Sequence, residues 1–280
     1  MRQFTRAEIL ARLRVKINNN QPIIMGGAGI GLIAKVADRA GIDAILAYNT
    51  GPFRMDGHGS FAGYLAYGDS NAITLELGSK LLPVVKNTPV IAGIGAADPY
   101  RDIGRLMTEM IEMGFSGIIN VPTTGLYGGD MREHIDHTGL GYPAEIDLIR
   151  MCRERDIFSC AYVFNPEESQ KMAEAGADVV AVHVNYTTGG MVAAKEDVAP
   201  DLDEACRQTD EMCSAARHVN PDVILLSHGG PFNNPESVQY SFDHTTVHGY
   251  MGASSIERIP VEIAITQVVK DFLSLRIKNN

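Results

Sequence analysis

Short apolar runs recur along the chain, and longer amphipathic stretches separate them. Eight such runs span residues 22–27, 44–49, 89–94, 117–122, 158–164, 179–184, 223–228 and 247–252. Their hydrophobic residues are nearly continuous rather than strictly alternating, which is typical of strands that are covered on both faces in a parallel sheet. The pattern therefore predicts eight parallel strands.

The stretches between these runs have helical periodicity, and several of them end on a glycine. Gly41, Gly114 and Gly176 each follow a predicted helix, at the position where a left-handed residue commonly ends one. One strand and one helix together occupy roughly 30 residues, which is the size of a βα unit. Eight units predict an α/β fold, a (β/α)₈ TIM barrel, rather than an open doubly wound sheet.

The chain contains no linker, low-complexity tract or change of composition, so residues 1–280 are expected to form a single TIM-barrel domain. Residues 1–20 predict an N-terminal helix that covers one end of the barrel. Thr5 and Glu8 have the spacing of a capping box, and Ile9 and Leu13 fall on one face of this helix.

Polar and small residues gather where the predicted strands lead into the following helices. TIM barrels bind their ligands at this C-terminal mouth. The candidate ligand-binding residues at the ends of the first, second and fourth strands are Gly26, Gly27, Asn49 and Asn120.

The sixth predicted strand carries a histidine with a clear orientation. Alternate residues of a strand share a face, so His183 and Asn185 point one way while Val180 and Val182 point the other. The valines suit the face that packs against helices, which places His183 and Asn185 at the mouth. A purely structural buried histidine remains an open alternative.

The seventh strand ends in His228, and two glycines follow it. In many barrels the loops after strands seven and eight bind phosphate through glycine amides and a helix N-terminus. Ordinary turn chemistry would also place small residues there. The anion-binding cradle predicted from these two loops consists of Gly229, Gly230, Gly252, Ala253, Ser254 and Ser255.

Two further candidates come from other loops. Arg54 lies in a long glycine-rich and aromatic segment, residues 49–71, which we expect to act as a mobile lid. Its guanidinium would clamp a carboxylate or a phosphate. Asp98 follows the third strand and is the acidic side chain best placed near the mouth, where it would orient a histidine or hold a metal.

Composition narrows the classes of partner. The net charge of -10 disfavours nucleic acid and anionic membrane surfaces, because both attract Lys and Arg. No apolar run approaches the ~20 residues that a membrane helix needs. We therefore expect a cytoplasmic protein whose partner is a small anionic molecule.

Two cofactor chemistries are not expected. Gly29, Gly31 and Ala34 match a dinucleotide-binding fingerprint, but the second strand ends in Tyr48-Asn49 instead of an acidic residue for the ribose. None of the eight lysines falls in a predicted strand, where a Schiff-base aldolase needs its lysine. We expect neither a nicotinamide nor a Schiff base.

Four segments, residues 25–35, 48–60, 120–132 and 226–237, resemble the phosphoenolpyruvate hydrolase-like TIM-barrel family, also described as TIM-barrel signal transduction proteins. The same barrel forms the C-terminal domain of a tomato tobamovirus-resistance protein. The family is related to the phosphoenolpyruvate mutase and isocitrate lyase superfamily. The resemblance implies that strand-end carboxylates hold Mg²⁺, which stabilises an enolate.

The superfamily motifs are incomplete in this chain. The D-x-D motif after the third strand would fall within residues 93–102, where only Asp98 stands near the strand end. Asp98 is therefore the candidate Mg²⁺ ligand. The K-K-C-G loop of the superfamily has no counterpart here.

These residues favour an enzyme that hydrolyses or cleaves a phosphoenolpyruvate-like or phosphonopyruvate-like acid. His183 and His228 would be the general acid and base, since histidine titrates near working pH. Arg54 and the cradle would hold the anion. The alternative is a non-catalytic barrel that senses a ligand or binds a protein in signal transduction. A homo-oligomer is expected in either case.

Overall fold

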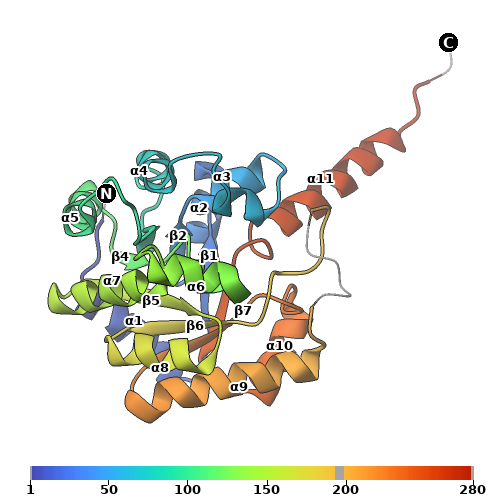
Figure 1. Ribbon diagram of the computed structural model, residues 1–280. Coiled ribbons are helices and arrows are strands. Elements are labelled where there is room, and N and C mark those ends of the chain that lie inside the picture. Colours follow the sequence, from blue (N-terminus) through green and yellow to red (C-terminus); the bar gives the residue numbers. More distant parts are fainter. Residues whose placement is uncertain (1, 193–198, 279–280) are drawn as a thin grey trace.

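The computed structural model describes residues 2–192 and 199–278, and its strands form a closed parallel barrel (Figure 1). The strands pair in chain order, and the last pairs with the first. Every strand lies within one of the predicted apolar runs, so the predicted (β/α)₈ TIM barrel is confirmed. The strands are β1 (Ile23–Gly27), β2 (Ala44–Ala47), β3 (Val90–Gly93), β4 (Gly117–Ile119), β5 (Phe158–Val163), β6 (Val179–His183), β7 (Ile224–His228) and β8 (Gly249–Gly252).

Helices surround the barrel, and α2 and α5 end on Gly41 and Gly114 in the left-handed conformation, as predicted. The helices are α1 (Arg6–Asn18), α2 (Gly31–Ala40), α3 (Thr50–Met55), α4 (Ser70–Leu81), α5 (Ile103–Met113), α6 (Gly129–His137), α7 (Tyr142–Glu154), α8 (Pro166–Glu174), α9 (Leu202–Val219), α10 (Pro235–His244) and α11 (Arg258–Leu273). Two short 3₁₀ helices are η1 (Ser60–Tyr64) and η2 (Thr124–Leu126).

The helix α1 closes the N-terminal end of the barrel. Its capping box is formed, because Thr5 Oγ1 accepts the Glu8 N–H at 3.2 Å and Glu8 Oε2 accepts the Thr5 N–H at 2.8 Å. Phe4, Ile9 and Leu13 are buried in one cluster with the residues that fill the barrel interior.

The strand β6 confirms the alternation read from the sequence. Val179 and Ala181 belong to the cluster inside the barrel. Val180 and Val182 belong to an outer cluster that includes apolar residues of α8 and α9. The next inward-facing position after Ala181 is His183, which therefore emerges at the mouth.

Two segments cover the C-terminal mouth. The first cover contains α3 and η1 and occupies most of the predicted lid at residues 49–71. Asn49 at the end of β2 holds it, because its Nδ2 donates to the Gly63 carbonyl at 2.6 Å and to Ser70 Oγ at 3.1 Å. The second cover contains η2 and α6, between β4 and α7.

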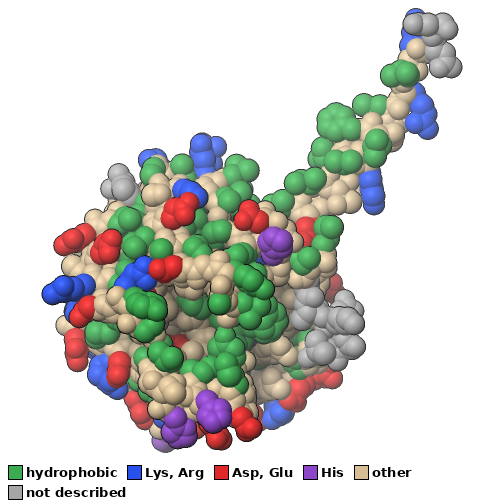
Figure 2. All heavy atoms as spheres, turned by 45° about the horizontal axis from the view of Figure 1, so that its top comes forward, with side chains coloured by type: hydrophobic (Ala, Val, Ile, Leu, Met, Phe, Trp, Pro, Cys, Tyr) green, Lys and Arg blue, Asp and Glu red, His purple; other side chains and the backbone are tan. Residues whose placement is uncertain are grey.

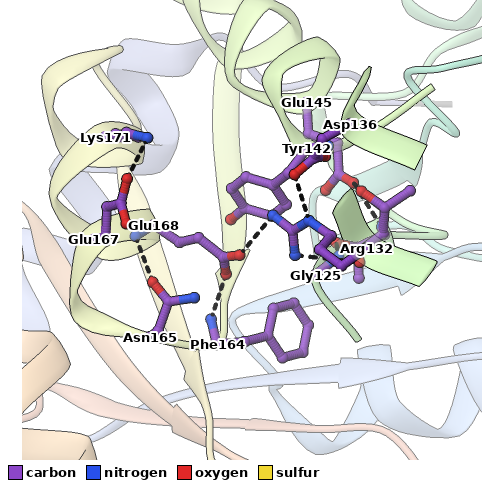
Figure 3. Close-up of polar contacts among 12 residues, drawn as sticks. Gly125, Arg132, Asp136, Tyr142, Glu145, Phe164, Asn165, Glu167, Glu168 and Lys171 are labelled. Carbon is purple, nitrogen blue, oxygen red and sulfur yellow. Dashed lines mark hydrogen bonds and ion pairs between the residues drawn. The ribbon is translucent and has the colours of Figure 1, made fainter. Parts of the chain in front are cut away.

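Arg132 fixes the second cover to the barrel (Figure 3). Its Nε lies 2.9 Å from Asp136 Oδ2, and its Nη2 lies 2.9 Å from Glu168 Oε1. The other Glu168 oxygen accepts the Phe164 N–H at 2.9 Å. The Phe164 ring lies 4.8 Å from the His183 ring, so this network reaches the mouth.

The helix α11 does not return to the barrel but points away from it (Figure 1). Arg258 is its one buried residue. Across residues 2–192 and 199–278, every helix is too short or too polar to cross a membrane.

Candidate functional site

A cavity of about 180 Å³, here called the histidine cavity, lies at the C-terminal mouth. Residues from strand ends, from the first cover and from the loop after β8 line it. Those that carry its chemistry are Tyr48, Arg54, Tyr162, His183, His228 and Ser254.

The two histidines face each other across neighbouring strands. His183 ends β6 and His228 ends β7, and the two are partners in the strand register. Their ring centroids are 4.6 Å apart. The Tyr162 ring lies 4.7 Å from the His228 ring, so the pair is enclosed by aromatic surface. The structure thus brings together the two histidines that the sequence analysis selected.

Backbone hydrogen bonds assign a different tautomer to each imidazole. His228 Nδ1 lies 2.6 Å from the Met251 carbonyl oxygen, which can only accept, so Nδ1 carries the proton and Nε2 keeps a lone pair. His183 Nδ1 accepts the Asn185 N–H at 3.2 Å, so its proton sits on Nε2. One ring therefore offers an acceptor at Nε2, and the other offers a donor.

Both imidazoles are neutral at pH 7. Burial lowers the pKa of His228 to about 4, because the charged ring loses its hydration, and the nearby Arg54 charge acts in the same direction. Burial lowers the pKa of His183 well below its usual value, and the nearby His228 ring adds to this shift. Neutral rings keep the two tautomers distinct.

Arg54 forms a buried ion pair instead of standing free. Its Nε lies 2.9 Å from Glu257 Oε1, and the side chains are 1% and 0% exposed. Its Nη1 donates to Thr50 Oγ1 at 2.6 Å. Burial raises the pKa of Glu257, and Arg54 opposes that shift. The adjacent Arg258 does not compete for Glu257, because Arg258 bonds Glu262 in the next turn.

One end of this ion pair keeps spare hydrogen-bonding capacity. Arg54 Nη2 and Glu257 Oε2 are buried without a hydrogen-bond partner. A Cβ at Gly27 would lie 3.1 Å from that Nη2, 3.3 Å from Tyr48 Oη and 3.4 Å from that Oε2. The glycine at this position therefore lets three polar groups pack closely against the backbone, and Arg54 Nη2 keeps an N–H that has no partner among the described residues.

Asp98 lies on the other side of the mouth, away from the histidines. It lines a second cavity of about 490 Å³, here called the acidic cavity, beyond the ends of β3 and β4. Asp98 Oδ2 accepts from Asn71 Nδ2 at 2.9 Å and from Arg101 Nη1 at 2.6 Å. Burial alone would raise the pKa of Asp98, but these hydrogen bonds outweigh burial and lower it. The expectation that Asp98 orients a histidine is therefore corrected: Met251 and Asn185 contact the two Nδ1 atoms.

Asn120 is held inside the barrel wall. Its Nδ2 donates to Glu145 Oε2 at 2.6 Å and to the Tyr162 carbonyl at 3.2 Å, and its Oδ1 accepts the Tyr162 N–H at 2.7 Å. These bonds connect β4 to β5 and to α7. Asn49 Nδ2 is similarly engaged in holding the first cover, whereas Asn49 Oδ1 is buried without a partner among the described residues.

The loop after β7 folds onto the loop after β6. The Gly230 N–H donates to the Asn185 carbonyl at 2.8 Å, and Gly229 approaches the same carbonyl so closely that a Cβ would lie 2.1 Å from it. The Gly230 amide is therefore engaged within the protein and does not form the predicted cradle. Asn185 is exposed, with a φ of 122°, and acts on the site through its backbone.

Of the remaining predicted cradle residues, Ala253 and Ser254 line the histidine cavity. Ser255 Oγ lies 2.7 Å from Tyr250 Oη. A Cβ at Gly26 would lie 2.8 Å from Ile42 Cδ1, and one at Gly252 would lie 2.8 Å from Ile256 Cδ1. Gly26 and Gly252 thus allow close apolar packing and do not face the cavity.

Some residues of the mouth were not identified from the sequence. Tyr162 could have been found, because it shares the inward parity of Phe158 and Cys160 in β5. Glu145 in α7 carried no comparable pattern. Glu145 is 1% exposed, and burial raises the pKa of its carboxyl group to about 7. It accepts hydrogen bonds from Asn120 and Thr124 beside the acidic cavity.

Asp98, the candidate Mg²⁺ ligand, is already engaged by protein side chains. Mg²⁺ is usually held by one or two carboxylates, and water and substrate oxygens complete its octahedral geometry. Within residues 2–192 and 199–278, no three His, Cys, Asp or Glu side chains gather in a way that could hold a metal ion. The candidate ligand Asp98 is already bonded to Arg101 and Asn71. We therefore assign no step to a metal.

Comparison of sequences identifies relatives along nearly the whole chain. The model of the phosphoenolpyruvate hydrolase-like family matches residues 8–275. The ToMV susceptible protein tm-1(GCR26) of Solanum lycopersicum is 42% identical over 274 residues, which are 98% of this chain and 36% of that protein. The chain thus spans about a third of the length of this relative.

Solved structures share the fold at low identity. A phosphonopyruvate hydrolase in complex with oxalate and Mg²⁺ aligns with a TM-score of 0.59 and 18% identity, over 95% of this chain and 86% of that one. The 2,3-dimethylmalate lyase, a member of the PEP mutase/isocitrate lyase superfamily, aligns with a TM-score of 0.59 and 16% identity, over 100% and 93%. These likenesses confirm the barrel. Because the family model covers all but the ends of the sequence, the chain belongs to the phosphoenolpyruvate hydrolase-like family.

Proposed function

We propose that the histidine cavity binds a small carboxylated or phosphorylated acid and hydrolyses a substrate of the phosphonopyruvate or phosphoenolpyruvate type. The observation that carries this proposal is the pair of neutral imidazoles with opposite tautomers in adjacent strands. Such a pair accepts a proton at one nitrogen and donates a hydrogen bond from another, within one enclosed space.

The size and polarity of the cavity support a small acid. Its volume of about 180 Å³ restricts the ligand to a few heavy atoms. Arg54 Nη2 has no partner among the described residues and suits a carboxylate or phosphoryl oxygen. Ser254 adds a hydroxyl to the lining. The aromatic side chains Tyr48 and Tyr162 limit access of water to the bound acid.

His228 acts as the base and then as the acid. Its Nε2 takes a proton from water while the water oxygen bonds to the phosphorus of phosphonopyruvate. The C–P bond breaks, and its electron pair remains on C3 as the enolate of pyruvate. Protonated His228 then returns the proton to C3, so water and phosphonopyruvate yield phosphate and pyruvate.

His183 stabilises the charge that develops. Its Nε2–H donates to the substrate carbonyl oxygen, which becomes the enolate oxygen. A neutral imidazole suits this role because it polarises the carbonyl without giving up its proton. Arg54 holds the acid group of the substrate so that the reacting atoms stay aligned.

The proposal is tested by incubating the purified chain with phosphonopyruvate and, separately, with phosphoenolpyruvate, and measuring pyruvate and phosphate. We expect equimolar release of both products by the wild-type chain. His228→Gln should abolish turnover, whereas His218→Gln, at an exposed histidine near the end of α9, should leave it unchanged. Absence of turnover with both substrates would contradict the hydrolase assignment.

A second candidate function is ligand sensing without turnover. It is favoured by the relative in tomato, whose name refers to susceptibility to a virus and not to a reaction. In this case the same cavity binds the acid, and the covers carry the response to a partner. Calorimetry with oxalate and phosphonopyruvate, combined with product analysis, separates the two functions: sensing gives heat of binding without pyruvate.

We also propose a cytoplasmic location. All four cysteines, Cys152, Cys160, Cys206 and Cys213, are free and buried. Reduced cysteines of this kind are usual in a reducing compartment. Fractionation of cells that express the chain, with detection in the cytosolic fraction, tests this location.

A further inference from the structure

The charged side chains that line the histidine cavity are both arginines. Arg54 contributes one part of the lining and Arg258 contributes another. Among the residues that the structure describes, no Asp or Glu lines this cavity. The imidazoles of His183 and His228 are neutral and add no charge at pH 7. The charge in the lining is therefore entirely positive, which favours a ligand that carries acid groups.

Arg258 lies at the base of α11, where this helix leaves the body of the molecule and projects from it (Figure 2). Its side chain is 4% exposed. Its Nη1 donates to Glu262 Oε1, and its Nη2 donates to the Gly189 carbonyl at 3.2 Å. A guanidinium has five N–H donors, so these bonds leave Arg258 with spare donors, and its Nε has no partner among the described residues.

Both arginines are held in place by carboxylates that do not line the cavity. Glu257 pairs with Arg54, and Glu262 pairs with Arg258. The second oxygen of Glu262 accepts the Met191 N–H at 2.9 Å, so this pair is also tied to the loop after β6. A side chain that is already fixed loses little conformational freedom when it binds a ligand. The two guanidinium groups are thus prepared for binding before a ligand arrives.

The surroundings of Arg54 suit a carboxylate. The hydroxyl oxygens of Thr50 and Ser60 lie 2.6 Å and 3.3 Å from Arg54 Nη1, so the arginine itself engages them. Arg54 Nη2 is buried and has no partner among the described residues. One free nitrogen in an enclosed position fits the smaller and planar kind of acid group.

The surroundings of Arg258 suit a phosphoryl group. Ser254, one helical turn before Arg258, places its residue in the same lining. It follows Met251 by three positions, and the Met251 carbonyl accepts from His228 Nδ1 at 2.6 Å. This part of the lining is therefore connected to the residue that acts at phosphorus in the proposed reaction. A guanidinium and a hydroxyl together serve several oxygens of one phosphoryl group.

We infer that Arg258 is a specificity-determining residue that makes the histidine cavity select acids with two acid groups. Arg54 binds the carboxylate, and Arg258 together with Ser254 binds the phosphoryl group. The inference deepens the proposed function and rests on it, because both use the same cavity and the same bound acid. It limits the substrates to short acids that carry a phosphoryl group at one end and a carboxylate at the other.

Calorimetry with two probes tests this selectivity in the full chain. Phosphonoacetate carries both acid groups but lacks the keto group that would become the enolate, so it reports binding alone. Pyruvate carries one acid group. We expect the wild type to bind phosphonoacetate at least about tenfold more tightly than pyruvate, because the second acid group gains charge-assisted hydrogen bonds. Equal dissociation constants for the two probes would overturn the inference.

Variants of the Arg258 pair separate recognition from structural support. Arg258→Gln should raise the dissociation constant of phosphonoacetate at least about tenfold and that of pyruvate less than about threefold. Glu262→Gln removes the paired carboxylate but keeps Arg258, and it should bind phosphonoacetate at least as tightly as the wild type. The matched control Arg276→Gln, at an exposed arginine beyond the end of α11, should change neither constant.

Two results with these variants would overturn the role of Arg258. The first is that Arg258→Gln weakens both probes by the same factor, because a general loss of structure would have that effect. The second is that Glu262→Gln weakens phosphonoacetate as much as Arg258→Gln does. The ion pair would then only hold the loop after β6.

Turnover of phosphonopyruvate distinguishes failure of this inference from failure of the proposed function. A wild type that shows the expected binding, with the expected loss in Arg258→Gln, but releases no pyruvate supports the selectivity and contradicts hydrolysis. A wild type that hydrolyses phosphonopyruvate, with an unchanged KM in Arg258→Gln, supports hydrolysis and overturns the role of Arg258.

Discussion

The two sides of the barrel mouth both contain buried titratable groups, but they differ in how fully these groups are engaged. On the β6–β7 side, one backbone bond to each Nδ1 fixes His183 and His228 and leaves each Nε2 for a ligand. On the β3–β4 side, Asp98 and Glu145 accept several bonds each from neighbouring residues.

We propose that this difference separates a reactive site from a supporting one. A group that must exchange a proton with substrate needs an atom that the protein has not already bonded. A carboxylate whose oxygens are engaged instead stabilises the loops around it. Residue type alone marks both sides as candidates, whereas the hydrogen bonds favour the histidine side.

The largest effect should come from the histidine side. We expect His228→Gln to lower kcat by about 10²–10⁴-fold, because it removes the base without unfolding the barrel. Turnover of phosphonopyruvate, measured as pyruvate release, checks this prediction. A variant that retains most of its kcat and an unchanged pH profile would show that the base lies elsewhere.

The buried ion pair should dominate stability. Arg54→Met leaves the Glu257 charge without its partner and should lower the free energy of unfolding by about 3–5 kcal/mol. The matched change on the acidic side is Arg101→Met, whose partly exposed pairs should contribute about 1 kcal/mol or less. Denaturant unfolding of both variants makes the comparison, and equal losses would contradict it.

The contributions of the two sides to the free energy of unfolding should also change with pH in opposite directions. The unfolded state of His228 binds a proton near pH 6.5 and the folded state near pH 4, so its contribution is present above about pH 6.5 and is lost as the pH falls through 4. Glu145 has a folded pKa of about 7 against an ordinary value of 4.5. Its contribution is present below about pH 4.5 and is lost as the pH rises through 7.

Unfolding free energies between pH 4 and 8 check these signs. Relative to the wild type, His228→Gln should lose less stability on acidification, and Glu145→Gln should lose less as the pH rises. Variants whose curves run parallel to that of the wild type over this range would refute the assigned pKa directions.

The smallest effect on turnover should come from the acidic side. We expect Asp98→Asn to change kcat by less than about threefold, because Asp98 touches neither histidine and its partners Asn71 and Arg101 remain. Addition of Mg²⁺ or of a chelator should likewise leave kcat nearly unchanged. A large loss in Asp98→Asn, recovered by added Mg²⁺, would restore the metal site that the family resemblance implied.

The sequence predicted the fold well because the information was local. The apolar runs identified every strand, and the parity of Val180, Val182 and His183 placed the histidine at the mouth. Capping signals such as Thr5 with Glu8 also act over a few residues. Patterns of this kind depend on neighbours in the chain, which the sequence displays directly.

The site was harder to predict because its partners are distant in the chain. Arg54 and Glu257 are 203 positions apart, and nothing near either residue indicates the pairing. The bond from Gly230 to the Asn185 carbonyl, which removes an amide from the expected cradle, also joins two loops. The direction of α11 follows from contacts of Arg258 and Glu262 with the loop after β6.

The assignment of opposite tautomers to the two histidines is tested most directly by ¹H–¹⁵N correlation spectroscopy of the chain labelled at histidine nitrogen, at pH 7. We expect His228 to carry its proton on Nδ1 and His183 to carry its proton on Nε2, with both rings neutral. Identical tautomers, or a charged imidazolium at either position, would contradict it.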